Sequence, residues 1–416
     1  MRAVVADLSV PALAASLVAP RLRGRPPWRS GPLLRLDGEH PVPPLPTTDD
    51  GAWVRVRPTL AGVCGSDLKL LRVTAYSPVL TAFNRSTRAV LGHEVVGVVE
   101  AVGPGVHGLA EGDRVALDPL LHCAHKGFEP CADCAAGRGG LCRRVDRAGG
   151  LAGGQGVGFT ERVGGGWSEA VVVPESGCVR LGDDVGDHRG VLTEPAAVAL
   201  HALLRWEGAG RVGSTGRAVV IGPGAVGLLV TALLRRLHPD LEVTVVAAEA
   251  SGARRALDAG AHQTVLQPTA DVLDVLAGRW GARRLRPRVG RLPVLDAGAD
   301  LVLDCVASSA TLDLAARLLR PRGSLVLVGT AGVQRHDWSL TWFRELEVLG
   351  SYTYAREPAL DGRSAVRAVV EDHLSDPSTP VDDLVTHRFA LEGYREALDT
   401  AAAGPALGAV KVTLQP

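Results

Sequence analysis

The sequence has no excess of charge of either sign, because Lys plus Arg and Asp plus Glu each number 45 among its 416 residues. A balanced surface creates no long-range field that would attract nucleic acid or an anionic membrane, so we expect neither as a partner. Long hydrophobic runs are also missing. The longest, residues 218–234, is interrupted by Gly222, Pro223 and Gly224 and is shorter than the roughly 20 residues of a spanning helix. We therefore interpret it as a buried strand that leads into a helix.

We also expect no secretion signal in the first residues, since Asp7 and Pro11 interrupt the apolar stretch that such a signal needs. We therefore expect a cytoplasmic protein. Three of the seven cysteines fall between residues 131 and 142. In a long chain without an export signal, this clustering favours metal ligation over a disulfide framework.

The chain is too long for one compact core, which predicts two domains that share a ligand-binding cleft. Up to about Gly177 the sequence consists of short β-like runs separated by glycine and proline, and this pattern indicates a small all-β barrel or sandwich. The predicted strands are Ala52–Arg57, Glu94–Val102, Asp113–Leu117 and Trp167–Val173.

After about Pro195 the pattern changes to strands that alternate with helices, which is typical of an α/β fold with a doubly wound parallel sheet. The predicted strands are Arg217–Ile221, Glu242–Ala247, Leu301–Val306 and Ser324–Val328, and the predicted helices are Val226–Leu237, Gly252–Ala259 and Thr311–Leu319. Residues 267–298, rich in arginine, are expected to form a surface excursion. Residues 350–416 are expected to supply an amphipathic helix and a closing strand that return to the first domain.

The clearest motif of the second half is GPGAVG at residues 222–227, between a predicted strand and a predicted helix. Gly222 permits a tight turn, Gly224 lets the backbone approach a pyrophosphate, and Gly227 permits close packing of helix on strand. The pyrophosphate would lie at the helix N-terminus, where free N–H groups favour negative charge. The motif predicts a dinucleotide site in a Rossmann sheet. Its expected members are Gly222, Pro223, Gly224, Ala225, Val226, Gly227, Glu249, Val306 and Gly329.

Glu249 decides the expected choice of dinucleotide. An acidic residue about 20 positions after the glycines usually binds the ribose hydroxyls of NAD. Glu249 lies near that distance, just beyond the predicted strand, although a solvated loop carboxylate is the alternative interpretation. Arg254 and Arg255 follow on the next helix and would suit a 2′-phosphate. We expect NAD, with NADP as the alternative.

Four cysteines in a short stretch predict a closed metal site. Cys123, Cys131, Cys134 and Cys142 have the spacing C-x7-C-x2-C-x7-C. Four thiolates satisfy a tetrahedral structural Zn²⁺ site, which stabilises a loop with little core of its own.

A second set of metal-ligand residues is spread along the chain: Cys64 in GVCGSDL, His93 and Glu94 in GHE, and Glu194 in LTEPAAVALH. A catalytic zinc takes three protein ligands and keeps one position open. Each residue also has a structural interpretation, as a buried cysteine, a core histidine or a helix-capping carboxylate. Their joint presence with a dinucleotide motif favours a catalytic zinc.

These motifs together resemble the zinc-containing medium-chain dehydrogenase/reductase family. MRAVV, GVCGSDL, GHEVVGVVEAVGPGV, GDRVAL, the cysteine loop, GGGWSEAVVVP, the EP pair, GPGAVG and LVLVG follow in the family's order. The resemblance implies a GroES-like β-barrel catalytic domain over residues 1–195, a Rossmann domain over 196–349, and a C-terminal segment over 350–416 that returns to the catalytic domain. The active site would lie between the domains, and we expect a homo-oligomer, either a dimer or a tetramer.

The Glu-Pro pair at 194–195 resembles the polyol and threonine dehydrogenase branch. In that branch, either the glutamate of GHE or the later glutamate completes the catalytic zinc shell, so Glu94 and Glu194 are both expected ligands. Asp67 would orient His93 through its other ring nitrogen.

The sequence departs from the family pattern at three places. Phe128 stands where the cysteine loop usually begins, so a longer loop must bring Cys123 round, with His125 as a less favoured ligand. Lys69 stands where a proton relay often ends in histidine. The segment between Cys64 and His93 is longer than expected and contains Tyr76 and Phe83, which would help to shape the substrate pocket.

The resemblance implies oxidation of an alcohol with NAD(P), and the reverse reduction of a ketone or aldehyde. Zinc would lower the pKa of the substrate hydroxyl, and Ser66 would pass its proton toward Lys69 or solvent. The alternatives are a zinc-free quinone or enoyl reductase of the same fold and a non-catalytic nucleotide-binding protein. The substrate is a small molecule that the sequence does not identify. Trp338 and Trp342 are candidate pocket residues and suggest a substrate with apolar surface, whereas the resemblance to the Glu-Pro branch suggests a polyol.

Overall fold

The computed structural model describes residues 1–23, 25–30, 32–46, 52–72, 86–149, 151, 154–209, 216–267, 269, 271–289 and 293–416. The chain forms two compact units. Unit 1 contains Met1–Ala197, Tyr354–Pro377 and Asp382–Pro416, and unit 2 contains Val198–Thr353 and Ser378–Val381. None of the helices in the described ranges is long and apolar enough to cross a lipid bilayer.

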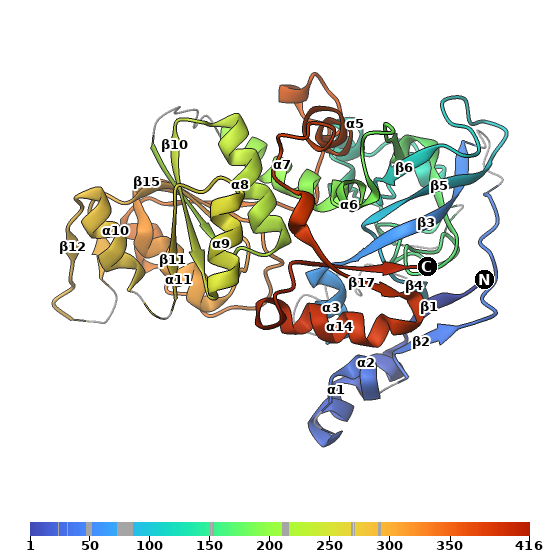
Figure 1. The fold of residues 1–416 in the computed structure, drawn as a ribbon, viewed down its shortest axis with the longest axis horizontal. Coiled ribbons are helices and arrows are strands. Elements are labelled where there is room, and N and C mark those ends of the chain that lie inside the picture. Colours follow the sequence, from blue (N-terminus) through green and yellow to red (C-terminus); the bar gives the residue numbers. More distant parts are fainter. Residues whose placement is uncertain are drawn as a thin grey trace. The chain divides into compact units, whose positions relative to one another are not determined.

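Unit 1 is built on β-sheets, as its alternating apolar runs predict (Figure 1). A seven-stranded sheet has the order β17-β18-β3-β5-β6-β8, with β7 paired to β3, and a three-stranded sheet has the order β2-β1-β4. The strands are β1 (Ala3–Asp7), β2 (Leu34–Asp37), β3 (Trp53–Val63), β4 (Arg88–Val90), β5 (Val95–Val102), β6 (Arg114–Leu117), β7 (Val171–Pro174), β8 (Cys178–Arg180), β17 (Val385–Ala390) and β18 (Lys411–Gln415). The last strand pairs with β3, so the end of the chain completes the sheet of unit 1.

Helices also occur in this first unit, which differs from the all-β expectation. Two of them, α1 and α2, lie between β1 and β2, where the sequence pattern was interpreted as strands and loops. Trp28 of α2 is buried, and its Nε1 donates to Asp399 Oδ1 of α14 at 2.7 Å. The helices are α1 (Val10–Arg23), α2 (Pro27–Ser30), α3 (Gly65–Leu71), α5 (Ala132–Ala135), α6 (Asp187–Gly190), α13 (Ala365–Val369) and α14 (Tyr394–Ala403). α7 (Thr193–Glu207) carries the chain from unit 1 into unit 2.

Unit 2 contains the predicted doubly wound sheet, so the expected α/β fold class is confirmed. Six parallel strands have the order β11-β10-β9-β14-β15-β16 (Figure 1). They are β9 (Gly216–Ile221), β10 (Leu241–Ala247), β11 (Gln263–Leu266), β14 (Ala299–Asp304), β15 (Leu319–Leu327) and β16 (Glu347–Gly350). The connecting helices are α8 (Ala225–Leu237), α9 (Ala250–Asp258), α10 (Val272–Trp280), α11 (Ser309–Leu318) and α12 (Ser339–Phe343). Residues of α10 and α11 pack with residues of the central strands in one apolar core, whereas α12 has no buried residue.

The Arg-rich stretch 267–298 is more ordered than expected. It contains α10 and a small hairpin of β12 (Arg284–Leu285) and β13 (Val294–Leu295). Leu273, Leu276 and Trp280 of α10 are buried in the core of unit 2. The expectation of a mere surface excursion is therefore wrong, because the arginines lie around a helix whose apolar residues repeat at helical spacing.

Candidate functional site

Cys64, His93 and Glu94 lie together in unit 1, and one donor atom of each is within 4.8 Å of the others. Cys64 follows β3 and is the N-cap residue of α3. Its Sγ accepts a hydrogen bond from Ser66 N at 3.5 Å, and Asp67 Oδ2 accepts one from the Cys64 N–H at 2.9 Å. This reciprocal cap fixes the direction of the thiol.

The two ring nitrogens of the buried His93 face different partners. Nδ1 lies 3.4 Å from Asp67 Oδ1, and Nε2 lies 3.5 Å from Ser66 Oγ. Burial acts to lower the pKa of His93, but Asp67 and Cys64 outweigh it and raise this pKa. The ring of Phe159 lies 5.0 Å from the imidazole ring, centroid to centroid. A carboxylate on one nitrogen orients the other nitrogen toward a metal, as we expected for Asp67.

Glu94 forms a buried ion pair with Lys411, a residue of β18 that sequence reasoning missed. Lys411 Nζ donates to Glu94 Oε1 at 2.6 Å and to Oε2 at 2.5 Å. Burial lowers the pKa of Lys411, but Glu94 and Cys64 outweigh it, so the pKa is raised. Gly62 leaves the room for this pair, because a Cβ at that position would lie 1.8 Å from Glu94 Oε2.

Glu194, the other expected carboxylate ligand, is buried in the first turn of α7. It does not belong to the group of metal-donor atoms found among the described residues. Burial raises its pKa to about 7, while His93 and Lys411 act against burial and Glu94 acts with it. Glu194 is therefore electrostatically coupled to the Cys64–His93–Glu94 group.

The donor atoms of this group fit Zn²⁺, because a thiolate, an imidazole and a carboxylate are the ligand types that a catalytic zinc takes. Ser66 is buried beside the group, and Lys69 lies one helical turn further along α3, half-buried. Tyr76 and Phe83, expected near the substrate, lie outside the described residues.

The four cysteines of the predicted structural site also come together in unit 1. The Sγ atoms of Cys123, Cys131, Cys134 and Cys142 all lie within 4.8 Å of one another. Such a group suits a closed tetrahedral Zn²⁺ site. Every one of the seven cysteines is a free thiol, which agrees with the expectation of metal ligation rather than disulfides.

The long loop before Cys131 brings Cys123 round by a tight turn. Residues Ala124–Lys126 form a 3₁₀ turn, Gly127 adopts a left-handed conformation with φ of 71°, and Phe128 N donates to Cys123 O at 3.0 Å. His125 is not part of the four-sulfur group, and its Nε2 lies 3.1 Å from Ser176 Oγ. The geometry therefore favours Cys123 over His125 as the first ligand.

In unit 2, the glycine motif has the geometry expected of a dinucleotide turn. Gly222 has a φ of 94°, and a Cβ on Gly227 would lie 2.0 Å from Gly222 O. Gly224 is the N-cap of α8 and has nothing within 4 Å of its Cβ position. Gly222 thus permits the turn, and Gly227 permits the close packing. Gly224 leaves open space at the helix N-terminus, where a pyrophosphate would lie. The residues between them, Pro223, Ala225 and Val226, are half-buried.

The other expected dinucleotide residues follow the carboxyl ends of the parallel strands, which meet at one edge of the sheet. Glu249 is exposed and is the N-cap of α9, directly after β10. Val306 follows β14 and touches the turn, since a Cβ on Gly222 would lie 2.4 Å from Val306 Cγ2. Gly329 follows β15, and its N–H donates to Asp304 O at 2.9 Å.

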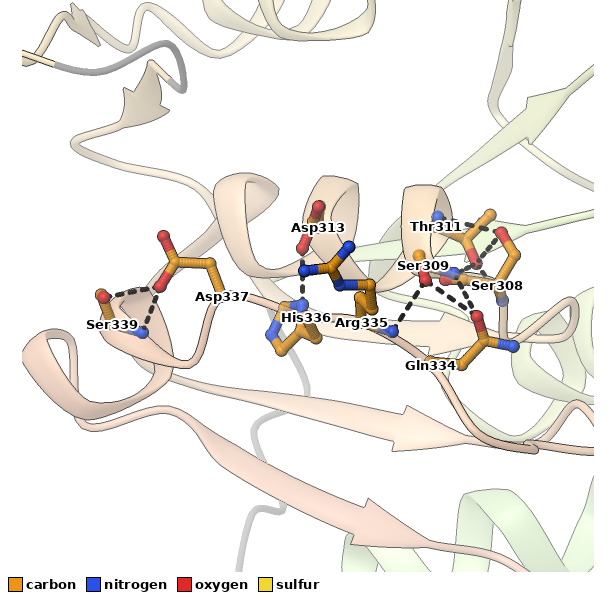
Figure 2. A network of polar contacts seen from close by, with 9 residues as sticks. All are labelled: Ser308, Ser309, Thr311, Asp313, Gln334, Arg335, His336, Asp337 and Ser339. Carbon is orange, nitrogen blue, oxygen red and sulfur yellow. Dashed lines mark hydrogen bonds and ion pairs between the residues drawn. The ribbon is translucent and has the colours of Figure 1, made fainter.

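Polar contacts anchor the segment that follows β15 to the start of α11 (Figure 2). Gln334 Oε1 accepts hydrogen bonds from Ser309 N at 3.0 Å and from Ser309 Oγ at 2.8 Å. Arg335 N donates to Ser309 Oγ, and His336 Nδ1 lies 2.6 Å from Asp313 Oδ1. The segment is therefore held in a defined course at the same edge of the sheet.

Two family profiles match the chain. The profile of the alcohol dehydrogenase GroES-like domain matches residues 50–183, and the profile of the zinc-binding dehydrogenase domain matches residues 225–371. These matches agree with the GroES-like and Rossmann domains that the sequence predicts.

Curated relatives match most of the chain at low identity. L-idonate 5-dehydrogenase of Vitis vinifera is 27% identical over 84% of this chain and 85% of its own length. Sorbitol dehydrogenase of Arabidopsis thaliana is 28% identical over 86% of this chain and 87% of its own length.

Solved structures with the same fold include a candidate zinc-binding dehydrogenase of Sinorhizobium meliloti bound to NADP. It is 26% identical, with a TM-score of 0.67 over 92% of this chain and 95% of that one. Galactitol-1-phosphate dehydrogenase of Escherichia coli is 24% identical, with a TM-score of 0.70 over the full length of both chains.

Proposed function

Because the chain belongs to the zinc-type alcohol dehydrogenases of the medium-chain dehydrogenase/reductase family, we propose that it oxidises an alcohol to a ketone or aldehyde, reversibly. The observation that carries this proposal is the convergence of Cys64, His93 and Glu94 in unit 1. A zinc-free reductase of this fold would need none of these donors, and a non-catalytic scaffold would have no use for a buried serine beside them.

The residues of unit 1 have separate parts in the reaction. Zinc, when bound, supplies a Lewis acid that lowers the pKa of the substrate hydroxyl. Cys64 and His93 would hold the metal, and Asp67 would orient His93 from the far side of the ring. Ser66 would accept the hydroxyl proton and pass its own proton onward, since its Oγ is buried and adjacent to His93 Nε2. Either Glu94 or Glu194 would complete the metal shell.

Lys69 is the proposed next point of the proton route. It lies on α3 one turn beyond Ser66 and is half-buried. The proton would pass to Lys69 or to solvent, and we propose the second route, in which Lys69 would hold the cofactor ribose while solvent takes the proton.

Unit 2 supplies the dinucleotide site. The turn at 222–227 and the N-terminus of α8 would hold the pyrophosphate, and Glu249, the N-cap residue of α9, would accept from the ribose hydroxyls of NAD. NADP is the alternative, with Arg254 exposed on α9 as a residue that suits its 2′-phosphate. When bound, the nicotinamide would supply the hydride acceptor for the substrate carbon.

The proposed substrate class is a polyol or sugar-like secondary alcohol. Relatives named for idonate, sorbitol and galactitol 1-phosphate oxidation support this class. The Glu-Pro pair at the start of α7 agrees with it.

The chain is also proposed to form a homo-oligomer in the cytoplasm. In unit 2, Trp338, Trp342 and Phe343 are exposed by 59%, 82% and 76%, and β16 is the edge strand of the sheet. Exposed aromatic side chains beside an open sheet edge suit pairing with a second copy of the chain. The free thiols fit a reducing compartment.

A substrate panel tests this function. Primary alcohols, secondary alcohols, linear polyols and sugar acids are offered with NAD⁺ and with NADP⁺, and reduced nicotinamide is followed by its absorbance. We expect turnover with at least one polyol or secondary alcohol. Turnover only of quinones or enoyl compounds, unaffected by Cys64→Ser, would support the zinc-free reductase instead.

A further inference from the structure

Lys126 is a fully buried cation inside the four-cysteine loop, with an exposed fraction of 1%. Its Nζ donates to Gly154 O at 2.6 Å, to Val145 O at 3.1 Å and to Arg144 O at 3.4 Å. The three ammonium donors are thus used on backbone carbonyls, which carry no compensating charge. Burying an ammonium is costly unless negative charge lies nearby, and none of these three hydrogen bonds supplies it.

Most of the counter-charge near Lys126 lies in the cysteines, and the Lys126 backbone N–H donates to Cys123 O at 3.1 Å. Burial lowers the pKa of Lys126, whereas Cys142 and Cys123, followed by Asp146 and Cys134, act in the opposite direction. Cys142 and Cys123 are both buried, and their Sγ atoms lie 3.5 Å apart. As thiols they would be neutral, and only as metal-bound thiolates do they supply the negative charge that a buried ammonium requires.

Arg144 supplies a second cation to the same sulfurs. Its Nη1 lies 3.9 Å from Cys123 Sγ, and its backbone N–H donates to Cys142 Sγ at 3.4 Å. The guanidinium also donates to Glu129 O and lies over the ring of Phe128, with its carbon 5.4 Å from the ring centroid. Phe128, which stands where the family usually has a cysteine, therefore serves as the platform that holds Arg144 against the site.

We propose that Lys126 and Arg144 are the charge-compensating residues of the four-cysteine site and that they retain its metal. Four thiolates and one Zn²⁺ carry a net charge of about −2, and two cations bring the sum close to zero. Burying an uncompensated charge is costly, so the cations stabilise the metal-loaded form more than the metal-free form. This inference rests on the assignment of zinc to these four cysteines.

The test uses the full-length chain with Cys64→Ser, which leaves the four-cysteine site as the source of bound zinc. Zinc transfer to a chromophoric chelator is timed for this background and for Lys126→Met and Arg144→Met within it. We expect each substitution to speed zinc loss by about tenfold or more, since 1.4 kcal/mol corresponds to a factor of ten. Arg147→Met, which removes an exposed arginine of the same loop, is the matched control and should leave the rate unchanged.

The thermal unfolding midpoints separate charge compensation from simple scaffolding of the loop. If the cations compensate charge, their substitution lowers the midpoint of the zinc-loaded protein more than that of the metal-free protein, in which no metal holds four thiolates together. An equal fall in both forms, or a release rate like that of the control, would overturn the proposal. If Lys126→Met does not fold, Arg144→Met decides alone. A background protein that holds no zinc would instead refute the metal assignment itself.

Discussion

The contact between Gly62 and Glu94 ties a single residue of β3 to the chemistry of the metal group. The glycine is needed for space, because the Glu94 carboxylate occupies the position that a side chain would fill. The same carboxylate holds Lys411, so three residues from three distant parts of the sequence depend on one another.

Gly62→Ala should therefore be strongly destabilising. Its Cβ would lie 1.8 Å from Glu94 Oε2 and must displace the carboxylate from Lys411. Disrupting a buried ion pair costs about 3–5 kcal/mol, which would appear as a lower thermal unfolding midpoint. Gly65→Ala is the matched control, because nothing lies within 4 Å of its Cβ position and alanine suits a helix. Equal midpoints for the two variants would show that the Glu94 pair contributes little.

Ser66→Ala should slow turnover while the metal content stays the same. The side chain is the buried hydroxyl nearest His93 Nε2, and losing a positioned proton acceptor costs on the order of 10²–10⁴ in rate. Lys69→Ala should have a smaller effect. The measurement is kcat/KM across a pH series for both variants. A Lys69→Ala loss that matches Ser66→Ala, with an ionisation near neutrality removed, would make lysine the terminal acceptor.

At the residue scale, a local interaction leaves a signal in the sequence. Cys64 and Asp67 are three positions apart, which is the spacing of the reciprocal helix cap that they form. The Glu94–Lys411 pair, at a separation of 317 positions, has no local signal. Glu94 and Lys411 come together because β18 pairs with β3. The sequence of one strand alone does not determine which residues of another strand it will face.

At the scale of elements, we propose that the connection between β10 and α9 sets the choice of dinucleotide. Glu249 is placed there as an exposed N-cap residue. Its carboxylate would accept from a ribose 2′-hydroxyl and repel a 2′-phosphate, so we expect a preference for NAD.

Glu249→Gln should narrow that preference by about tenfold or more, since a hydrogen bond to a charged group contributes about 1.5–3 kcal/mol. The ratio of kcat/KM for NAD⁺ and NADP⁺ measures it, and Arg254→Gln on the same helix is the control. A wild-type preference for NADP that Arg254→Gln abolishes would transfer the specificity to the arginine.

Helices and strands were predicted where apolar residues repeat at regular spacing, and they were missed where prolines or many charged residues interrupt that spacing. The strand predicted over Ala52–Arg57 continues to Val63, because the sheet accommodates Pro58 with a shift in register between Pro58 and Leu60. α10 was hidden by the arginines that surround it. α1 was missed because Pro11 and Pro20 argue against a helix, although a proline near a helix start is tolerated.

At the scale of the whole molecule, the order of the motifs along the sequence indicates the family. No single motif decides the family, but the metal donors of unit 1 and the glycine turn of unit 2 occur in one chain and in one order. The fold class follows from the change, after Pro195, from short β-like runs to strands that alternate with helices. The substrate does not follow from the sequence, because Tyr76 and Phe83, which we expected near the pocket, stand in a segment without a periodic pattern.

The central claim is that a zinc held by Cys64, His93 and one of the two glutamates, Glu94 or Glu194, makes this chain an alcohol dehydrogenase, and zinc removal tests it most directly. Zinc per chain and formation of reduced nicotinamide are measured together for wild type and Cys64→Ser, during chelation and after zinc is restored. We predict two zinc ions per wild-type chain, loss of turnover as one leaves, recovery when zinc returns, and one zinc with no turnover in Cys64→Ser. Full turnover by metal-free protein, or by Cys64→Ser, would contradict the account.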